Sequence, residues 1–291
     1  YKKKTLRLGD LLHLDKPHIQ SRLKTMLEYK NLELGGCYHQ APMSYPALLS
    51  WCEKKAEQFA PYITDTGNYI AAALSNHQKV VLEAQLGAMR DIDYGIFPYT
   101  SSSSTISAYG PIGAGIPGTL PDHIVGVLKA YSTCVGAGPF TAEKAMPEKW
   151  MESLRKSGGE YGAATGRPRR VGPFDAVASA YGLKCQNADK IALTKLDVLS
   201  RMDEIPVITA YKLNDELITE FDPLDDLDSM TPVIQTLPGW NTDISKCRKY
   251  EELPENARKY IETLEHLLNH EIQFISVGAE RNQYLTKGEW L

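Results

Sequence analysis

The sequence predicts an α/β protein, with a mainly parallel β-sheet flanked by helices and a helical block at its N-terminal end. After residue 79, hydrophobic strand-like runs alternate with helical segments, as expected for parallel strands joined by helices. Polar residues directly follow the predicted strands, and the carboxyl ends of such strands are where open α/β sheets bind ligands. We therefore expect a helical subdomain over 1–78 and an α/β region that binds ligands over 79–291.

Composition limits the function further. The 291 residues carry a net charge of −4 and are 43% hydrophobic and 23% charged, which is typical of a globular protein. A mildly acidic total argues against a protein that coats nucleic acid, because that function needs a broad basic face. The five cysteines are scattered without zinc-type spacing, so we expect reduced thiols in a cytoplasmic protein and no metal site. No apolar run reaches the roughly 18 residues that span a bilayer.

Three helices are predicted in the N-terminal block. The first begins after Asp15-Lys16-Pro17 and the second at Ser44-Tyr45-Pro46, each with a proline in its first turn. The third is predicted over about 65–76. Few residues in this block suggest chemistry.

The α/β region is predicted from a series of hydrophobic and amphipathic runs. In chain order these are strands over 79–83 and 125–135, helices over 147–156 and 175–184, strands over 190–194 and 206–211, a helix over 254–270 and a strand over 272–275.

The most informative stretch is 158–170, Gly-Gly-Glu-Tyr-Gly-Ala-Ala-Thr-Gly-Arg-Pro-Arg-Arg. Backbone with so few side chains approaches a ligand closely and turns its N–H groups toward an anion. Arginine adds a planar fork that binds carboxylate or phosphate. Pro168 favours extended backbone at Arg167, so Arg167 and Arg169 should point toward different anionic groups. A basic surface loop is the alternative.

Two further turns follow predicted strands. Lys195-Leu196-Asp197 follows the strand over 190–194, and Ser276-Val277-Gly278 follows the last strand. An aspartate can accept hydrogen bonds from the ring N–H and exocyclic amine of guanine, while a lysine stem covers the base. Adenine lacks those donors in that arrangement. A surface salt bridge between Lys195 and Asp197 is the alternative.

Taken together in this order, the segments resemble adenylosuccinate synthetase over essentially the whole chain. The most specific motifs lie at 129–133, 135–140, 165–167, 194–199 and 237–240. The resemblance implies a P-loop-NTPase-like fold and a ligase of purine (AMP) biosynthesis that acts as a cytoplasmic homodimer. Its reaction joins IMP and L-aspartate to adenylosuccinate through 6-phosphoryl-IMP, with GTP as co-substrate and Mg²⁺ as cofactor.

The resemblance also implies which residues contact each substrate. The expected IMP contacts are Lys3 (reaching the partner subunit's site in a dimer), Gln85, Leu86, Ser101, Val135 and Arg167. The expected aspartate site is Ala163, Ala164, Thr165, Gly166, Arg167 and Arg169. The expected GTP contacts are Arg169, Lys195, Leu196, Asp197, Ser276, Val277 and Gly278.

Four positions depart from the family pattern. Leu86 stands where a glutamine contacts IMP, with Gln85 one residue earlier, and a one-residue shift reverses side-chain direction on a strand unless a bulge restores it. Ser101 replaces a threonine and keeps the hydroxyl, whereas Ala164 replaces a threonine and loses it. Lys3 replaces an arginine and keeps the charge without the fork. These departures leave another purine nucleotide, such as dGMP, as an alternative acceptor.

The family's phosphate-binding glycine loop, catalytic aspartate and catalytic histidine are expected before the segment that matches Tyr1. No catalytic residue and no Mg²⁺ ligand is therefore expected among these residues, and this segment alone is expected to be inactive. A non-catalytic nucleotide-binding or dimerisation fragment is the remaining alternative.

Overall fold

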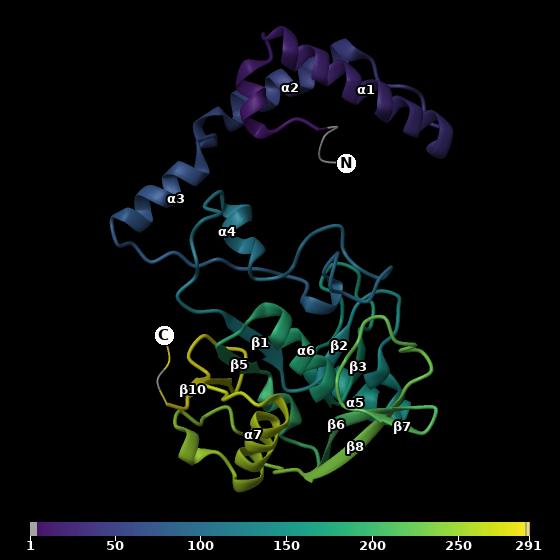
Figure 1. Ribbon diagram of the computed structural model, residues 1–291, viewed down its shortest axis with the longest axis vertical. Helices are drawn as coiled ribbons and strands as arrows, with labels where there is room; N and C mark the ends of the chain where they lie inside the picture. The colour runs from purple at the N-terminus through teal and green to yellow at the C-terminus, as the bar shows by residue number, and fades with distance from the viewer. Residues whose placement is uncertain (1–4, 289, 291) are drawn as a thin grey trace. The chain divides into compact units, whose positions relative to one another are not determined.

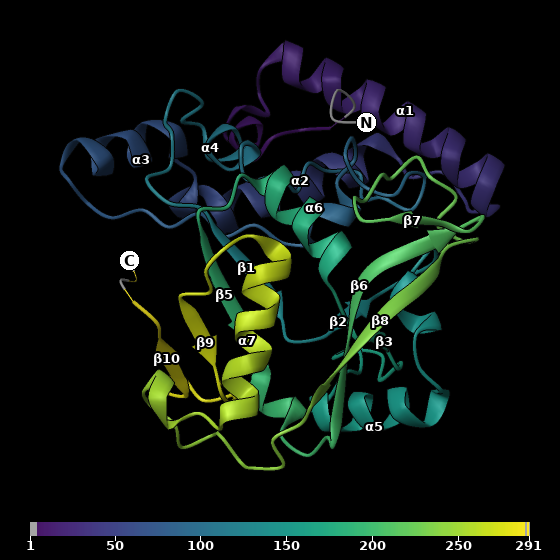
Figure 2. The ribbon, with the colours of Figure 1, turned by 60° about the horizontal axis from the view of Figure 1, so that its bottom comes forward.

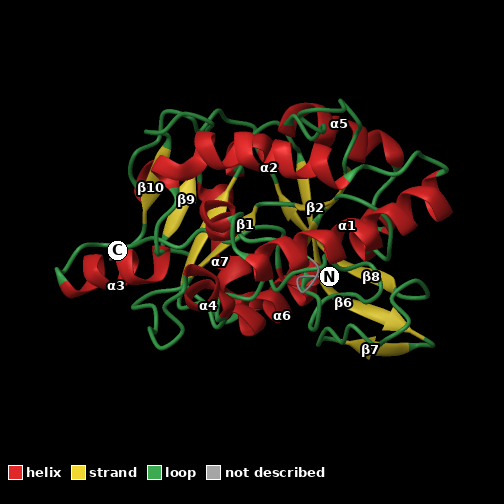
Figure 3. Cartoon of the chain, turned by 90° about the horizontal axis from the view of Figure 1, so that it is seen from above, coloured by secondary structure: helices red, strands yellow, loops and turns green. Residues whose placement is uncertain are grey.

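The computed structural model describes residues 5–288 and Trp290. The chain divides into two compact units (Figure 1). The first consists of the chain up to Val80 together with Ala114–Ile116, and the second of Val81–Gly113 and Pro117–Leu291. Every strand of the described residues belongs to the second unit, and the first is helical (Figure 3).

The three helices predicted in the N-terminal block are confirmed. They are α1 (Pro17–Tyr38), α2 (Tyr45–Phe59) and α3 (Thr66–Ser75). The side chains of Ser44 and Asp65 accept hydrogen bonds from the first turns of α2 and α3, which satisfies backbone N–H groups that have no partner within the helix. Leu11, Leu23 and Cys52 are buried and form the small core of this unit.

The described residues of the second unit form three sheets. The main sheet has the order β1–β5–β9–β10, formed by β1 (Val125–Lys129), β5 (Lys190–Thr194), β9 (Phe274–Ser276) and β10 (Tyr284–Thr286). The first three strands run parallel, and β10 is antiparallel to β9. The other strands are β2 (Ser132–Cys134), β3 (Arg170–Gly172), β4 (Phe174–Asp175), β6 (Glu204–Leu213), β7 (Glu216–Ile218) and β8 (Thr231–Pro238). β2 pairs with β3, while β6 lies parallel to β4 and antiparallel to β7 and β8.

Helices cover the sheets of this unit. They are α5 (Glu148–Gly158), α6 (Ala176–Gln186) and α7 (Glu255–Leu268), while α4 (Tyr109–Ala114) precedes β1 in the chain. Figure 2 shows α7 lying across β5 and β9. Ile261 and Leu264 of α7 are buried in one core with Ile191, Leu193 and Ile275 of these strands, and this burial holds the main sheet in place. The α/β prediction is confirmed, although the antiparallel strands make the sheets mixed.

Two strand predictions are wrong in part. Residues 79–83 form a loop in which Val81 is 89% exposed, because no described strand lies beside them to complete a ladder. The strand predicted over 125–135 is split into β1 and β2 at Ala130 and Tyr131. Tyr131 turns its side chain inward, where it is 2% exposed. The strands β3, β4, β7, β8 and β10 were not predicted. β8 is obscured by Pro232 and Pro238, which are typical of edge strands.

One hydrogen bond joins α7 to the end of β1. The hydroxyl of Tyr260 is fully buried and donates to the carbonyl of Ala130 at 2.7 Å. Tyr260→Phe removes this donor and leaves the buried carbonyl without it, so we expect the free energy of unfolding to fall by about 1–2 kcal/mol. Denaturant unfolding measures the change. Tyr284→Phe is the control, since Tyr284 is 43% exposed, and equal losses in the two variants would contradict the role of this bond.

Candidate active site

The candidate site lies at the carboxyl edge of the main sheet. β1, β5 and β9 are parallel neighbours, with Lys129 opposite Thr194 and Leu193 opposite Ile275. The turns that follow β5 and β9 therefore lie next to each other, at the position where sheets of this type bind ligands. These turns are Lys195-Leu196-Asp197 and Ser276-Val277-Gly278.

Lys195 ends β5 with a left-handed backbone, φ 61°, and starts a short 3-10 helix over Leu196–Leu199. The side chain of Leu196 is fully buried in the core, so only its backbone can face a ligand. Asp197 is half-buried, and burial is the main reason that the pKa of its carboxyl is raised. Among the described residues, none other than Asp197 itself donates a hydrogen bond to this carboxylate. A carboxylate in this state favours a ligand that brings its own donors.

The second turn is tight. Val277 is fully buried, and its N–H donates to the carbonyl of Gln283 at 2.9 Å. A Cβ on Gly278 would lie 2.2 Å from the Gln283 side chain, so a larger residue there would displace that side chain. The Ser276 hydroxyl donates to the Gly278 carbonyl at 3.0 Å. This turn therefore has a fixed shape beside Asp197.

The loop over 160–169, which we call the arginine loop, is a closed hairpin. The N–H of Arg169 donates to the Glu160 carbonyl at 2.9 Å, and the N–H of Gly162 donates to the Arg167 carbonyl at 2.8 Å. The tip over 163–166 is exposed, and Gly166 adopts φ 63°, a backbone conformation that favours glycine. The guanidinium of Arg167 is exposed and makes no hydrogen bond or ion pair with any described residue. The tip thus presents uncovered backbone next to an unpaired guanidinium.

A buried carboxylate, Glu160, lies at the base of this loop and is 0% exposed. Its Oε1 accepts hydrogen bonds from Lys129 Nζ at 2.9 Å, Tyr131 Oη at 2.6 Å and Lys195 Nζ at 3.1 Å. Its Oε2 accepts from Arg169 Nη1 at 2.8 Å. We call these five side chains the Glu160 network. The network joins the arginine loop to the ends of β1 and β5.

Burial works against the charge of Glu160, but hydrogen bonds from Tyr131 and Lys129 outweigh it and lower the pKa of the carboxyl to about 2. Burial and the Glu160 hydrogen bond raise the pKa of the Tyr131 hydroxyl. Tyr131 therefore stays protonated as a donor, and Glu160 stays ionised as an acceptor. Three cations and one carboxylate leave the Glu160 network with an excess of two positive charges, which favours an anionic ligand.

The lowered pKa of Glu160 makes stability depend on pH. A carboxyl whose pKa is lower in the folded than in the unfolded state stabilises the fold above its ordinary pKa of 4.5, and this contribution is lost as the pH falls toward 2. A shift of this size corresponds to about 3 kcal/mol. Unfolding measured between pH 2 and 6 should therefore lose stability more steeply in the native protein than in Glu160→Gln. Parallel curves for the two proteins would contradict the assignment.

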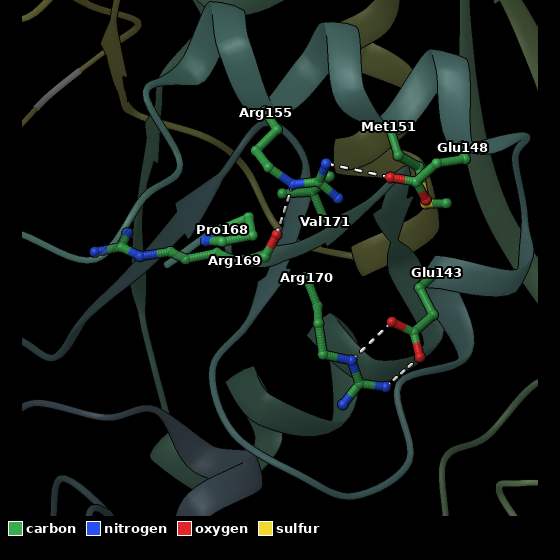
Figure 4. Close-up of a pocket in the computed structure, with 8 residues that line it drawn as sticks. All are labelled: Glu143, Glu148, Met151, Arg155, Pro168, Arg169, Arg170 and Val171. Carbon is green, nitrogen blue, oxygen red and sulfur yellow. Dashed lines mark hydrogen bonds and ion pairs between the residues drawn. The ribbon is translucent and has the colours of Figure 1, made fainter. Parts of the chain in front are cut away.

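The three arginines after the glycines differ in their partners. Arg167 is unpaired, Arg169 joins the Glu160 network, and Arg170 binds Glu143 with its Nε 2.7 Å from Oε2. Figure 4 shows the Arg169 guanidinium pointing away from Arg170, while its carbonyl accepts a hydrogen bond from Arg155 Nε at 2.9 Å. The charged groups of Arg167 and Arg169 thus have separate surroundings.

Two of the residues expected to bind IMP are brought together by Arg90. Its carbonyl accepts from the N–H of Ser101 at 2.8 Å, and its guanidinium donates to the carbonyls of Val135 at 3.0 Å and Ala137 at 3.2 Å. Val135 itself is 69% exposed. The fully buried Asp91 accepts backbone hydrogen bonds from the loop that carries Ser101, including the N–H of Thr105 at 2.6 Å.

The other described residues expected to bind IMP take no part in the contacts of Arg90 and Asp91. Gln85 and Leu86 lie in an exposed loop, and Leu86 has a left-handed φ of 75°. Because residues 79–83 are not a strand, the expectation that a one-residue shift reverses side-chain direction along a strand does not apply here. Lys3 lies outside the described residues.

Sequence reasoning assigned no role to Glu160 or Arg90. Glu160 is the only acidic residue in the stretch over 158–170, which also carries three arginines. A single carboxylate among arginines indicates an ion pair, and this pattern could have pointed to Glu160. Arg90 had no comparable signal, since its role depends on carbonyls 45 and 47 residues away. Among residues 5–288 and 290, no three or more His, Cys, Asp and Glu side chains gather as metal ligands. None of the described helices is long and apolar enough to cross a bilayer.

Comparison with known proteins agrees with this arrangement. The family model for adenylosuccinate synthetase matches residues 1–285. The chain belongs to the adenylosuccinate synthetase family. The adenylosuccinate synthetase of Carboxydothermus hydrogenoformans is 40% identical over 279 residues, which are 96% of this chain and 64% of that protein. The Staphylococcus saprophyticus adenylosuccinate synthetase is 36% identical, over 98% of this chain and 66% of its own.

A solved structure supports the same family. The fully ligated adenylosuccinate synthetase from Plasmodium falciparum is 33% identical and superimposes with a TM-score of 0.86, covering 98% of this chain and 67% of that one. The predicted family and fold are therefore confirmed. The chain spans 64–66% of the length of the adenylosuccinate synthetases from Carboxydothermus hydrogenoformans and Staphylococcus saprophyticus.

Proposed function

We propose that the full-length protein is a GTP-dependent ligase that joins IMP and L-aspartate to adenylosuccinate through 6-phosphoryl-IMP, in purine (AMP) biosynthesis. The observation that carries this proposal is a pair of charged side chains, each without a hydrogen-bond partner in another described residue. Asp197 is half-buried and receives no hydrogen bond from another described residue, and Arg167 is unpaired at the tip of a glycine-rich loop. The Glu160 network connects the elements that carry them.

Guanine is assigned to the turns after β5 and β9. The Asp197 carboxylate would accept the ring N–H and exocyclic amine of guanine, two donors that adenine does not present in this arrangement. The Lys195 ammonium already donates to Glu160 and, at 2.6 Å, to the carbonyl of Gly158. Its aliphatic stem is thus held in place and left to cover the base. The turn at Ser276, Val277 and Gly278 would border the other edge of guanine.

L-Aspartate is assigned to the exposed tip of the arginine loop. Arg167 would bind a carboxylate of the substrate through its guanidinium fork, and the backbone N–H groups over 163–165 would bind the remaining oxygens. The N–H of Gly166 already donates to the Gly162 carbonyl at 2.7 Å. Arg169, which is held by Glu160, would lie between the aspartate and GTP sites. IMP is assigned to the surface that includes Gln85, Leu86, Ser101 and Val135, with Arg167 facing it from the loop.

The cofactor and assembly are proposed on the family relationship. Mg²⁺ accompanies GTP in this proposal, but the described residues hold no cluster of carboxylates that fits the ion, so no step is assigned to it through them. A cytoplasmic homodimer is also proposed. An alternative purine acceptor is not favoured, because relatives at 36–40% identity are named adenylosuccinate synthetase.

The test is an assay of the full-length protein with IMP, L-aspartate, GTP and Mg²⁺. Adenylosuccinate and GDP should form in equal amounts, with IMP used in preference to dGMP. If no product forms from IMP, the proposal is overturned. If dGMP is used in preference to IMP, the acceptor nucleotide is dGMP and not IMP.

A further inference from the structure

The Glu160 network contains a residue that no substrate assignment requires. Glu160 is completely buried, so its carboxylate faces no ligand directly. Yet its two oxygens bind side chains from both halves of the site, Arg169 through Oε2 and Lys195 through Oε1. Arg169 belongs to the arginine loop. Lys195 belongs to the turn after β5, Lys195-Leu196-Asp197, which we call the guanine-reading turn.

We propose that Glu160 is a positioning residue that holds the arginine loop and the guanine-reading turn in fixed positions relative to each other. Losing it would therefore weaken the use of L-aspartate and of GTP in parallel. This inference rests on the proposed function. Arg169 and Lys195 repel each other as like charges unless an anion lies between them, and Glu160 is the carboxylate that both contact.

The backbone around Glu160 supports the same role. Its carbonyl accepts from the Arg169 N–H at 2.9 Å, which closes the arginine hairpin, and its own N–H donates to the Arg155 carbonyl at the end of α5. Lys195 also donates to the carbonyl of Gly158, two residues before Glu160. A Cβ on Gly158 would lie 2.4 Å from the Tyr131 hydroxyl, so the close approach that builds the network depends on glycine there.

A variant of Tyr131 tests the positioning role without changing any residue that is proposed to contact a substrate. It is 2% exposed, and its hydroxyl donates to Glu160 Oε1 at 2.6 Å. It belongs to none of the proposed substrate contacts. Any change in substrate use caused by removing this hydroxyl must therefore be transmitted through Glu160.

The experiment measures KM for L-aspartate and for GTP in the full-length protein. Glu160→Gln keeps the size of the side chain but removes the charge that holds Arg169 and Lys195. We expect both KM values to rise roughly tenfold, because a displaced Arg169 or Lys195 would weaken the binding of each substrate by about as much as one lost charge-assisted hydrogen bond. Tyr131→Phe should raise both by a smaller and similar factor, about threefold, and it serves as the test if Glu160→Gln does not fold.

The matched control is Asp175→Asn. Asp175 is another buried carboxylate, and it accepts a hydrogen bond from the hydroxyl of Tyr211 at 2.7 Å. It lies at the end of β4, outside the main sheet, and caps the N-terminus of α6. This variant should lower Tm and leave both KM values within about twofold. If native protein turns over and Glu160→Gln or a folded Tyr131→Phe changes only one KM or neither, the positioning role is overturned while the proposed function stands. No product from native protein overturns both.

Discussion

Replacing Arg167 with alanine is expected to lower kcat/KM for L-aspartate by roughly a hundredfold, with little change in the free energy of unfolding. Hydrogen bonds to charged groups contribute about 1.5–3 kcal/mol each, and a guanidinium fork makes two of them with a carboxylate. Two such bonds at the low end of that range, about 3 kcal/mol together, correspond to a loss of roughly a hundredfold. Stability should be retained because the Arg167 guanidinium contacts no described residue by hydrogen bond or ion pair. Steady-state kinetics at saturating GTP and IMP measure the effect.

Arg167→Lys is the matched control. Lysine keeps the positive charge but loses the planar fork, so this variant should recover only part of the lost activity. IMP use should weaken in Arg167→Ala as well, since the same guanidinium is assigned to face IMP. Unchanged kinetics in a folded Arg167→Ala protein would remove the arginine loop from the aspartate site.

Asp197→Asn is expected to lower kcat/KM for GTP by roughly a hundredfold and to remove most of the preference for GTP over ATP. The carboxylate is assigned to accept two hydrogen bonds from guanine, and an amide presents a donor to one of those guanine donors. Sites that recognise a substrate by buried hydrogen bonds discriminate strongly, because a mismatch leaves polar groups unpaired. Competition between GTP and ATP in the full-length assay measures the ratio.

Inosine triphosphate provides the control for this prediction in the native protein. Its base keeps the ring N–H of guanine but lacks the exocyclic amine, so it should fall between GTP and ATP. Full discrimination against ATP in Asp197→Asn would mean that guanine is read elsewhere.

Local sequence signals predicted the elements that form their own contacts. The proline-initiated helices α1 and α2 and the amphipathic α7 lie where the sequence places them, because a proline in the first turn and an apolar face depend on residues close together in the chain. The strand over 190–194 is also confirmed, since its run of apolar residues is buried on both faces.

The errors arose where structure depends on distant partners. Residues 79–83 have strand-like composition but lie beside no described strand, and the strand over 125–135 breaks where Tyr131 turns toward Glu160. Neither outcome can be seen in the segment itself, because tertiary contacts override local preference. The structure brings Lys195 and Arg169 together on one carboxylate. Both were expected to contact GTP, but Glu160, the residue that joins them, was not predicted.

The most direct measurement is a structure of the full-length protein with GDP, IMP and L-aspartate bound. Guanine should lie against Asp197 with both of its donors within hydrogen-bond distance of the carboxylate, and the substrate aspartate should lie on the loop over 163–169 beside Arg167. Guanine or aspartate bound away from this edge of the sheet would contradict the account.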